Sequence, residues 1–387
     1  MRALILADDS FARREAPMLA RLEVGLSGEG VRVVRAVPAE CLPQIATPVS
    51  SQVVGYEAGP NWFTRRGRAR RLLASVAAAL DGAGAAAAAD APDLDVIHCF
   101  GHDALELAMA AARMSGAGVA LEVWSGDMIG RARALAVERA GREGEPPLIL
   151  FAPDLSMARE LRGGIQGGEA GVLPGTPELI EVTPWGVHPV AACRPPIDPA
   201  VTVSVAVLAD GQDARAVFHV IDALAELATR LPNLLVFFDG DVAARIGGGH
   251  TVWQRAKSRG LLDRLSMVGG MEGHREPILH VDLLIQPEAV GAHHSLTLDA
   301  MAAGVVVVAR EDPLVDALRD EETALLVRRG GAREWAAAIE GIITDPARAQ
   351  RLRDGARAFV RDHRSPSGHV AAVLRGYERL SGLRQLA

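Results

Sequence analysis

The stretch from Val281 to Val308 carries side chains that could bind an anionic ligand at the end of a strand. Its first residues, Val281–Gln286, form an apolar run that is typical of a parallel strand covered on both faces. The loop that follows contains two neighbouring imidazoles, His293 and His294. Because open α/β sheets bind ligands at the carboxyl ends of their strands, this loop is the first candidate site.

A helix start borders the same loop. Ser295 is a suitable N-cap for an apolar helix over Leu296–Ala303, and Gly304 is suited to end that helix. The unpaired N–H groups of a helix start favour a phosphate whatever the side chains are. Val305–Val308 is then expected to form a second buried strand.

The composition is that of a globular protein with two domains. The chain has 387 residues, of which 49% are hydrophobic and 23% are charged. This length exceeds one typical core, so two domains are expected. The net charge of −7 argues against general nucleic-acid binding. Lys257 is the single lysine, so a phosphate-binding lysine is scarcely available.

Cysteine usage and hydropathy favour a cytoplasmic location. Cys41, Cys99 and Cys193 are widely spaced and form neither a disulfide framework nor a zinc pattern. The N-terminus begins as a short strand and soon becomes charged, unlike a signal peptide. No apolar run reaches the roughly 18–20 residues that a membrane span requires.

Strands and helices alternate along the whole chain. Strands are expected at residues 2–7, 31–37, 94–100, 119–124, 148–152, 180–183, 201–208, 234–238, 265–268, 281–286, 305–308 and 323–327. Helices are expected at residues 13–27, after the strand at 94–100, at 154–161, 215–230, 252–259, 296–303 and 313–319, and towards the C-terminus. The alternation predicts two doubly wound α/β domains with a cleft between them.

Proline-rich sequence marks the domain boundary. Four prolines lie between residues 189 and 199: Pro189, Pro195, Pro196 and Pro199. We expect a first domain over residues 1–190, a second over 191–365, and a C-terminal helix over 366–387 that packs back on the first. The low-complexity stretch Asp81–Asp93 is expected to be a helix end that runs into a linker.

The order of these motifs resembles the two-Rossmann-domain (GT-B) glycosyltransferases, most closely the retaining enzymes of family 4, glycosyl transferases group 1. The strongest likeness is LLIQPEAVGAHHSLTLDAMAAGVVVVA at 283–309. Further likenesses are DVIHCFGHDALELAM (95–109), PWGVHP (184–189), RLPNLLVFFDGD (230–241) and LSMVGG (265–270). The resemblance covers nearly the whole chain and implies two Rossmann-like doubly wound domains that face each other across a cleft.

The resemblance also implies a donor site in the second domain. The two glutamates of the family motif fall on Gly291 and Asp299; the resemblance assigns the nucleotide ribose to Asp299, and Glu288 is a candidate substitute at the first position. The diphosphate-binding Lys and Arg fall on Arg215 and Asp210, so an anion replaces one cation. The other donor-binding candidates are Gly270, Met271, His293, His294, Ser295 and Leu296.

The first domain is expected to hold the acceptor. The glycine-rich first loop of the family is absent, because residues 8–12 read DDSFA. His102, Ser125 and Gly126 are the candidate catalytic or acceptor-orienting residues. His98, inside an apolar strand, is expected to be buried.

Partners and cofactors follow from the same reasoning. The basic cluster TRRGRARR (64–71) is either a solvated helix start or a contact, through Arg65–Arg71, with an anionic membrane. No metal-ligand spacing is present, and the resemblance implies neither metal nor cofactor. A nucleotide sugar and an unidentified acceptor are the expected partners, and nucleic acid is not.

The function implied by the resemblance is a retaining transfer of a sugar, such as a hexose, from a nucleoside-diphosphate sugar. Arg215 and the amides near Ser295 would stabilise the leaving diphosphate. The changed charges at Gly291 and Asp210 also fit an alternative function, in which the chain is a catalytically inactive GT-B protein that acts as a binding or partner subunit. A different activity on the same fold, such as sugar-nucleotide epimerisation, is a third reading.

Overall fold

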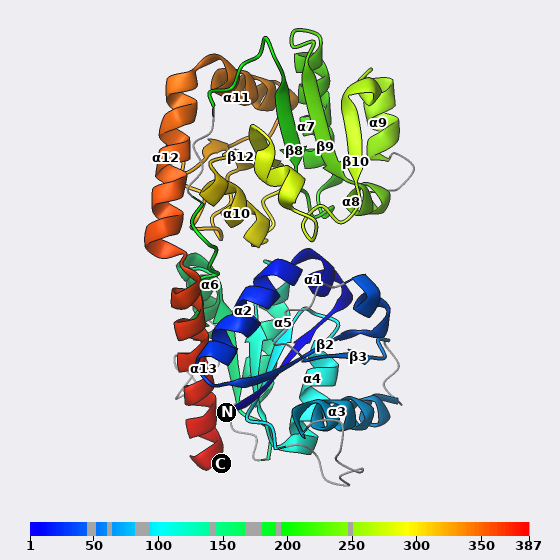
Figure 1. Cartoon of the computed structure of the whole chain (residues 1–387), viewed down its shortest axis with the longest axis vertical. Helices are drawn as coiled ribbons and strands as arrows, with labels where there is room; N and C mark the ends of the chain where they lie inside the picture. Colours follow the sequence, from blue (N-terminus) through cyan, green and yellow to red (C-terminus); the bar gives the residue numbers. More distant parts are fainter. Residues whose placement is uncertain are drawn as a thin grey trace. The chain divides into compact units, whose positions relative to one another are not determined.

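The chain forms two compact α/β units. The computed structural model describes residues 1–44, 52–59, 64–81, 93–139, 144–166, 180–190, 195–246 and 251–386; Cys193 and most of the expected linker lie outside them. Unit 1 comprises Met1–Trp185 and Pro366–Ala387, and unit 2 comprises Gly186–Ser365. Both contain a parallel sheet with helices on its two faces, as the alternation predicts (Figure 1).

The sheet of unit 1 has the strand order β3-β2-β1-β4-β5-β6-β7. Its strands are β1 (Arg2–Ala7), β2 (Arg32–Pro38), β3 (Gln52–Tyr56), β4 (Val96–Phe100), β5 (Gly118–Glu122), β6 (Leu148–Ala152) and β7 (Ile180–Val182). The central strands are buried along their length, as near-continuous apolar runs predict. Because all described pairings are parallel, the carboxyl ends of these strands meet at one edge of the sheet.

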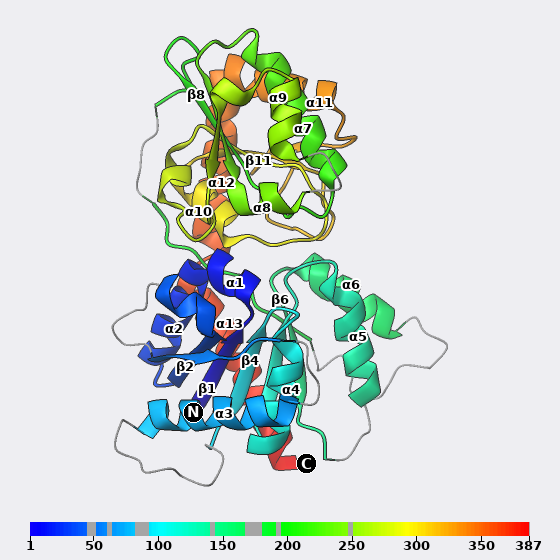
Figure 2. The same cartoon turned by 90° about the vertical axis from the view of Figure 1, so that its right-hand side faces the viewer.

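Helices cover both faces of this sheet. They are α1 (Asp9–Arg14), α2 (Ala16–Gly28), α3 (Arg65–Asp81), α4 (Leu105–Ser115), α5 (Met128–Arg139), α6 (Leu155–Gln166) and α13 (Pro366–Leu386), with a 3₁₀ turn, η1 (Ala39–Gln44). Figure 2 shows α3 beside α4 on one face, and α13 runs behind the strands with α2 on the other. The C-terminal helix thus completes the layer over strands β4 to β7.

The sheet of unit 2 has the order β10-β9-β8-β11-β12-β13. Its strands are β8 (Val203–Val207), β9 (Leu234–Asp239), β10 (Leu265–Val268), β11 (Leu283–Gln286), β12 (Val306–Arg310) and β13 (Leu325–Val327). Its helices are α7 (Ala214–Ala228), α8 (Gly240–Arg245), α9 (Val252–Ser258), α10 (Ser295–Ala303), α11 (Ala332–Thr344) and α12 (Pro346–His363), with 3₁₀ turns η4 (Leu262–Arg264) and η5 (Glu276–His280). Helices α7, α9 and α11 pack together, and α10 packs with α12. Its core includes the three valines of β8, Val306 and Val308 of β12, and the fully buried Trp335.

Several local expectations were wrong. The helix expected at 13–27 is interrupted at Glu15, where α1 ends and α2 begins. Residues 313–319 form turns and no helix. Ser295 is the first residue of α10, and His294 occupies the N-cap, where its side chain makes no capping hydrogen bond to the first turn of the helix. Strand β3 and helix α5 were not anticipated. Among the described residues, no helix has the length and apolar character to span a bilayer.

Candidate functional site

The carboxyl edge of the unit 2 sheet brings together the loops that the sequence singled out. These loops follow β8, β10 and β11, and the loop after β12, which the sequence did not single out, lies at the same edge of the sheet. Between them lies a cavity of about 10 Å³, which has room for about one water molecule. The cavity is lined by Leu208, Asp210, Gln286, Glu288, Val290, Ala292, His294, Arg310, Asp312, Val315 and Leu318. In this structure, the side chains of the edge therefore fill most of the space themselves.

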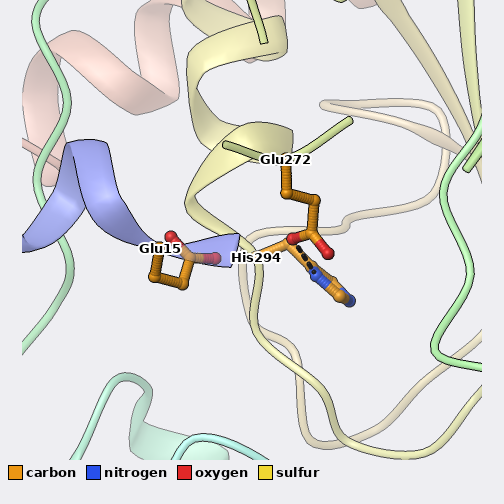
Figure 3. Close-up of side chains that lie close together, drawn as sticks. All are labelled: Glu15, Glu272 and His294. Carbon is orange, nitrogen blue, oxygen red and sulfur yellow. Dashed lines mark hydrogen bonds and ion pairs between the residues drawn. The ribbon is translucent and has the colours of Figure 1, made fainter. Parts of the chain in front are cut away.

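His294 bridges two buried carboxylates at this edge. Its Nδ1 lies 2.9 Å from Glu272 Oε2 (Figure 3). Its Nε2 lies 3.1 Å from Asp210 Oδ2. Burial alone would lower the pKa of His294, but Asp210 and Glu272 outweigh burial and raise that pKa to about 10. The imidazole is therefore a cation near neutral pH, and it compensates the anion that stands where the family has an arginine.

Glu288 holds the loop after β8. Its Oε2 accepts hydrogen bonds from the backbone N–H groups of Asp210 and Gly211, the latter at 2.9 Å, and its Oε1 accepts one from Asp213. Three N–H groups that converge on one carboxylate form an anion-binding arrangement. Glu288 thus fills, from within the chain, a place that an exogenous anion could otherwise take.

Asp299 and Ser295 share one arginine. Arg275 Nη1 lies 2.5 Å from Asp299 Oδ2 and donates to Ser295 Oγ at 2.9 Å. The side chains of Arg275 and Asp299 are only 8% and 11% exposed. The shortened acid of the family motif therefore lies beside a cation that the sequence pattern did not indicate.

Two glycines of the predicted donor site have left-handed backbone conformations. Gly291 has φ +67° and its N–H donates to Asp312 Oδ2 at 2.6 Å. Gly270 has φ +59° and its N–H donates to Asp241 Oδ2 at 3.2 Å. A glycine at 291 is thus suited to the turn of the loop, since other residues adopt this conformation at a cost.

The remaining donor candidates differ in exposure. Arg215 is exposed on the first turn of α7. His293 is 7% exposed, and Met271 and Leu296 are fully buried. Met271 contributes its backbone N–H to Asp239 Oδ2 at 3.2 Å. Burial of Asp239 raises its pKa, and the N–H groups of Val242 and Asp241 oppose that shift.

Unit 1 has its own pocket at the carboxyl edge of its sheet, with a volume of about 460 Å³. It lies beside the ends of β1, β2, β3 and β4. Its lining residues are Asp8, Asp9, Pro38, Tyr56, Glu57, Ala58, Gly59, Arg65, Arg68, His102, Asp103, Glu106, Leu107 and Arg131. The volume lies within the usual range for small-molecule sites.

Of the three predicted catalytic residues, His102 lines this pocket and Ser125 and Gly126 do not. His102 Nε2 contacts Arg131 Nη1. Since a guanidinium can only donate, Nε2 must accept, which places the imidazole hydrogen on Nδ1. Ser125 and Gly126 form the turn before α5; the Ser125 hydroxyl is buried and has no hydrogen-bond partner among the described residues.

His98 is buried, as expected, in a polar network inside unit 1. Its Nδ1 lies 3.0 Å from the Tyr377 hydroxyl and its Nε2 lies 3.2 Å from Glu122 Oε2. Trp185 Nε1 donates to Glu122 Oε1 at 2.6 Å. Burial lowers the pKa of His98, although Glu122 opposes that shift. The network joins α13 to strands β4 and β5.

Several lining residues escaped the sequence analysis. Asp8 and Asp9 follow β1 in the place of the glycine-rich loop, and their position after a strand was the available signal. Burial raises the pKa of Asp8, against hydrogen bonds from the N–H groups of Phe11 and Asp103. Arg131 gave no local signal, because it lies in α5, which the sequence did not predict. Glu272 follows the predicted strand β10 and stands next to the candidate Met271, so its position after a strand was the available signal.

Comparisons with known proteins agree with this architecture. Residues 198–359 match the family model described as Glycosyl transferases group 1. A comparison with curated protein sequences finds no match.

Solved structures of the same fold span almost the whole chain. Alr3699/HepE from Anabaena, in complex with UDP-glucose, has a TM-score of 0.69 and 15% identity, covering 98% of this chain and 100% of that one. Sucrose-phosphate synthase from Thermosynechococcus elongatus has a TM-score of 0.67 and 16% identity, covering 99% and 100%. WaaG, a glycosyltransferase involved in lipopolysaccharide biosynthesis, has a TM-score of 0.62 and 16% identity, covering 97% and 99%. Residues 198–359 of this chain thus match the glycosyl transferases group 1 model, and the whole chain has the GT-B fold of these structures.

Proposed function

We propose that this chain transfers a sugar from a nucleoside-diphosphate sugar to an acceptor, with retention of configuration at the anomeric carbon. The observation that carries the proposal is the family match over residues 198–359, which lies within unit 2 and includes all its strand-end loops. The Anabaena structure of the same fold is described as a complex with UDP-glucose, which supports a nucleotide-sugar donor.

The loop between β11 and α10 is the proposed donor site. The N–H groups at the start of α10 favour the diphosphate, which gains negative charge as the sugar leaves. Arg215, exposed on the first turn of α7, would supply a mobile cation for the same oxygens. Asp299 would accept the ribose hydroxyls, with Arg275 holding its carboxylate in place.

The internal charges of this edge set the conditions for donor binding. Asp210 would repel a diphosphate, but the imidazolium of His294 compensates that charge at a distance of 3.1 Å. Glu288 occupies the amides of the loop after β8, so the diphosphate must bind beside these amides or displace the carboxylate. The acceptor is assigned to unit 1, whose pocket contains His102.

Thermal unfolding of the full chain with UDP, GDP, ADP and UDP-glucose tests the proposal. A saturating nucleotide should raise Tm, because a ligand at about 100 times its Kd stabilises the native state by about 2.7 kcal/mol. Asp299→Asn should abolish that rise, and Asp263→Asn, at an exposed site in unit 2, should not.

The chemical step needs its own readout. When a donor that binds is used, NMR of the product should show that the transferred sugar keeps the anomeric configuration that it had in the donor. Inversion would overturn the retaining mechanism. The absence of a Tm rise with every nucleotide would overturn the donor proposal and favour a non-catalytic GT-B protein.

A further inference from the structure

The unit 1 pocket has an arginine side and a carboxylate side. The arginine side consists of Arg65, Arg68 and Arg131, with Glu106 between two of them. The carboxylate side consists of Asp8, Asp9 and Asp103. A ligand that satisfies both sides must carry an anionic group and hydrogen-bond donors.

One carboxylate is shared by two guanidinium groups on the arginine side. Arg65 Nη1 lies 2.7 Å from Glu106 Oε2, and Arg131 Nη2 lies 2.9 Å from Glu106 Oε1. With Arg68, which also contacts the Gly59 carbonyl oxygen, the side carries three positive charges and one negative charge, a net charge of +2. The other acid near these arginines, Glu57, is paired with Arg71 at 2.6 Å. A phosphate monoester carries about −1.5 to −2 at pH 7, so its charge matches the local excess on the arginine side. The complete lining has three arginines and five carboxylates, so the phosphate must bind on that side of the pocket.

The carboxylate side is fixed by hydrogen bonds to its neighbours. Asp8 is 6% exposed; its Oδ1 accepts from Phe11 N–H at 2.9 Å, and its Oδ2 accepts from Asp103 N–H at 3.3 Å. Asp9 Oδ1 accepts from Arg13 Nε at 2.7 Å and from the Cys41 thiol at 2.9 Å. A carboxylate has about four acceptor sites, so Asp8 retains capacity for ligand hydroxyls.

We propose that the unit 1 pocket binds a phosphate monoester of a polyhydroxylated compound, a sugar phosphate, as the acceptor. Arg65, Arg68 and Arg131 bind the phosphate, and Asp8 and Asp9 accept hydroxyl hydrogens. The role as acceptor rests on the proposed glycosyl transfer, whereas binding to the pocket does not.

The basic cluster at the start of α3 is thereby divided in two. Arg65 and Arg68 line the pocket, whereas Arg66 and Arg70 are exposed and do not. The same helix therefore offers a matched pair of variants: Arg65→Gln removes a proposed phosphate ligand, and Arg66→Gln removes an equal charge outside the pocket. Phosphate groups of a lipid surface would use the exposed arginines instead.

Calorimetric titration of the full chain with glucose 6-phosphate, glucose 1-phosphate and glycerol 3-phosphate tests the proposal. At least one ester should bind, and more tightly than inorganic phosphate or glucose. Arg65→Gln and Arg131→Gln should each weaken binding about tenfold or more, and Arg66→Gln should not. Glu106→Gln should tighten binding, because it removes the negative charge beside the arginines. A substitution that merely damaged the pocket would weaken ester binding, as the arginine variants do, and would not strengthen it.

Two further measurements separate the possible failures. The Tm rise with nucleotides should be unchanged in Arg65→Gln. If nucleotides raise Tm and no phosphate monoester binds, the pocket assignment is overturned and the donor proposal stands. If esters bind and nucleotides do not, the donor proposal fails instead. Binding to phosphatidylglycerol vesicles that depends on Arg66 and Arg70, with no ester binding, would overturn the pocket in favour of a lipid surface.

Discussion

The charge of His294 makes the stability of this chain depend on pH. Its folded pKa is raised from 6.5 to about 10 by two buried carboxylates, against the opposing effect of burial. A raised folded pKa contributes stability that is complete below pH 6.5 and is lost as pH rises towards 10. We expect a loss on the order of a few kcal/mol across that range. Urea unfolding at a series of pH values, followed by circular dichroism, measures it.

His294→Gln isolates this contribution. The variant should be less stable than the wild type at pH 6.5, because Asp210 and Glu272 lose their cation, and the difference should shrink towards pH 10. His274→Gln, at an exposed histidine of unit 2, should keep the wild-type profile. A difference that stays constant from pH 6.5 to pH 10 would show that His294 is not charged in the folded chain.

Glu288 stabilises the loop after β8 through three backbone N–H groups. Glu288→Ala leaves these donors without their acceptor, and we expect a loss of about 1–3 kcal/mol. Glu288→Gln keeps one acceptor oxygen and should therefore lose less stability than Glu288→Ala. Glu276→Gln, on a side chain that is 83% exposed, is the control. Inorganic phosphate should stabilise Glu288→Ala more than the wild type; equal stabilisation would mean that the amides do not bind an anion.

At the scale of elements, close contacts decide which helix glycines can be replaced. A Cβ at Gly355, within α12, would lie 2.0 Å from the backbone oxygen of Glu322, which cannot rotate away. Gly355→Ala should therefore destabilise unit 2 by about 1–3 kcal/mol. Gly341→Ala, in α11, meets only the end of the Arg348 side chain at 3.4 Å and should stabilise by about 0.5–1 kcal/mol. Thermal unfolding of the two variants gives the comparison, and a stabilised Gly355→Ala would contradict the tight contact.

The predictable elements were those with strong local patterns. Apolar runs located β1, β6 and β10 to the residue, and α10 was placed within one residue of its start. Strand β3 was missed because its five residues include Gln52 and Gly55 and only its last residue is buried. Helix α5 was missed because arginines interrupt its apolar stripe.

The pairings within the candidate site could not be read from local sequence. Asp210 and His294 are 84 residues apart, and their contact depends on β8 lying beside β11 in the sheet. From the sequence alone, Asp210 is an anion that would repel a diphosphate, and the histidine that compensates its charge is not apparent. Arg275 and Asp299 are nearer in sequence, but η5 and α10 are separated by β11 and its loop.

For the whole molecule, the main consequence of the topology is that unit 1 is built from both ends of the chain. Its sheet comes from residues before Trp185, and α13 returns after unit 2 to cover β4 to β7. Val373, Tyr377 and Leu380 of α13 are fully buried there. Unit 2 is continuous, from Gly186 to Ser365. Loss of the C-terminus should therefore affect the two units differently.

A chain that ends at Ser365 tests this division. Without α13, the apolar face of β4 to β7 is exposed, so unit 1 should unfold or lose most of its protection from hydrogen exchange, and unit 2 should keep its own. Tyr377→Phe is the graded control: it removes only the hydroxyl that lies 3.0 Å from His98 Nδ1, for an expected loss of about 1 kcal/mol. Hydrogen exchange with mass spectrometry resolves the two units. Equal loss of protection in both units on truncation would show that they do not fold as separate bodies.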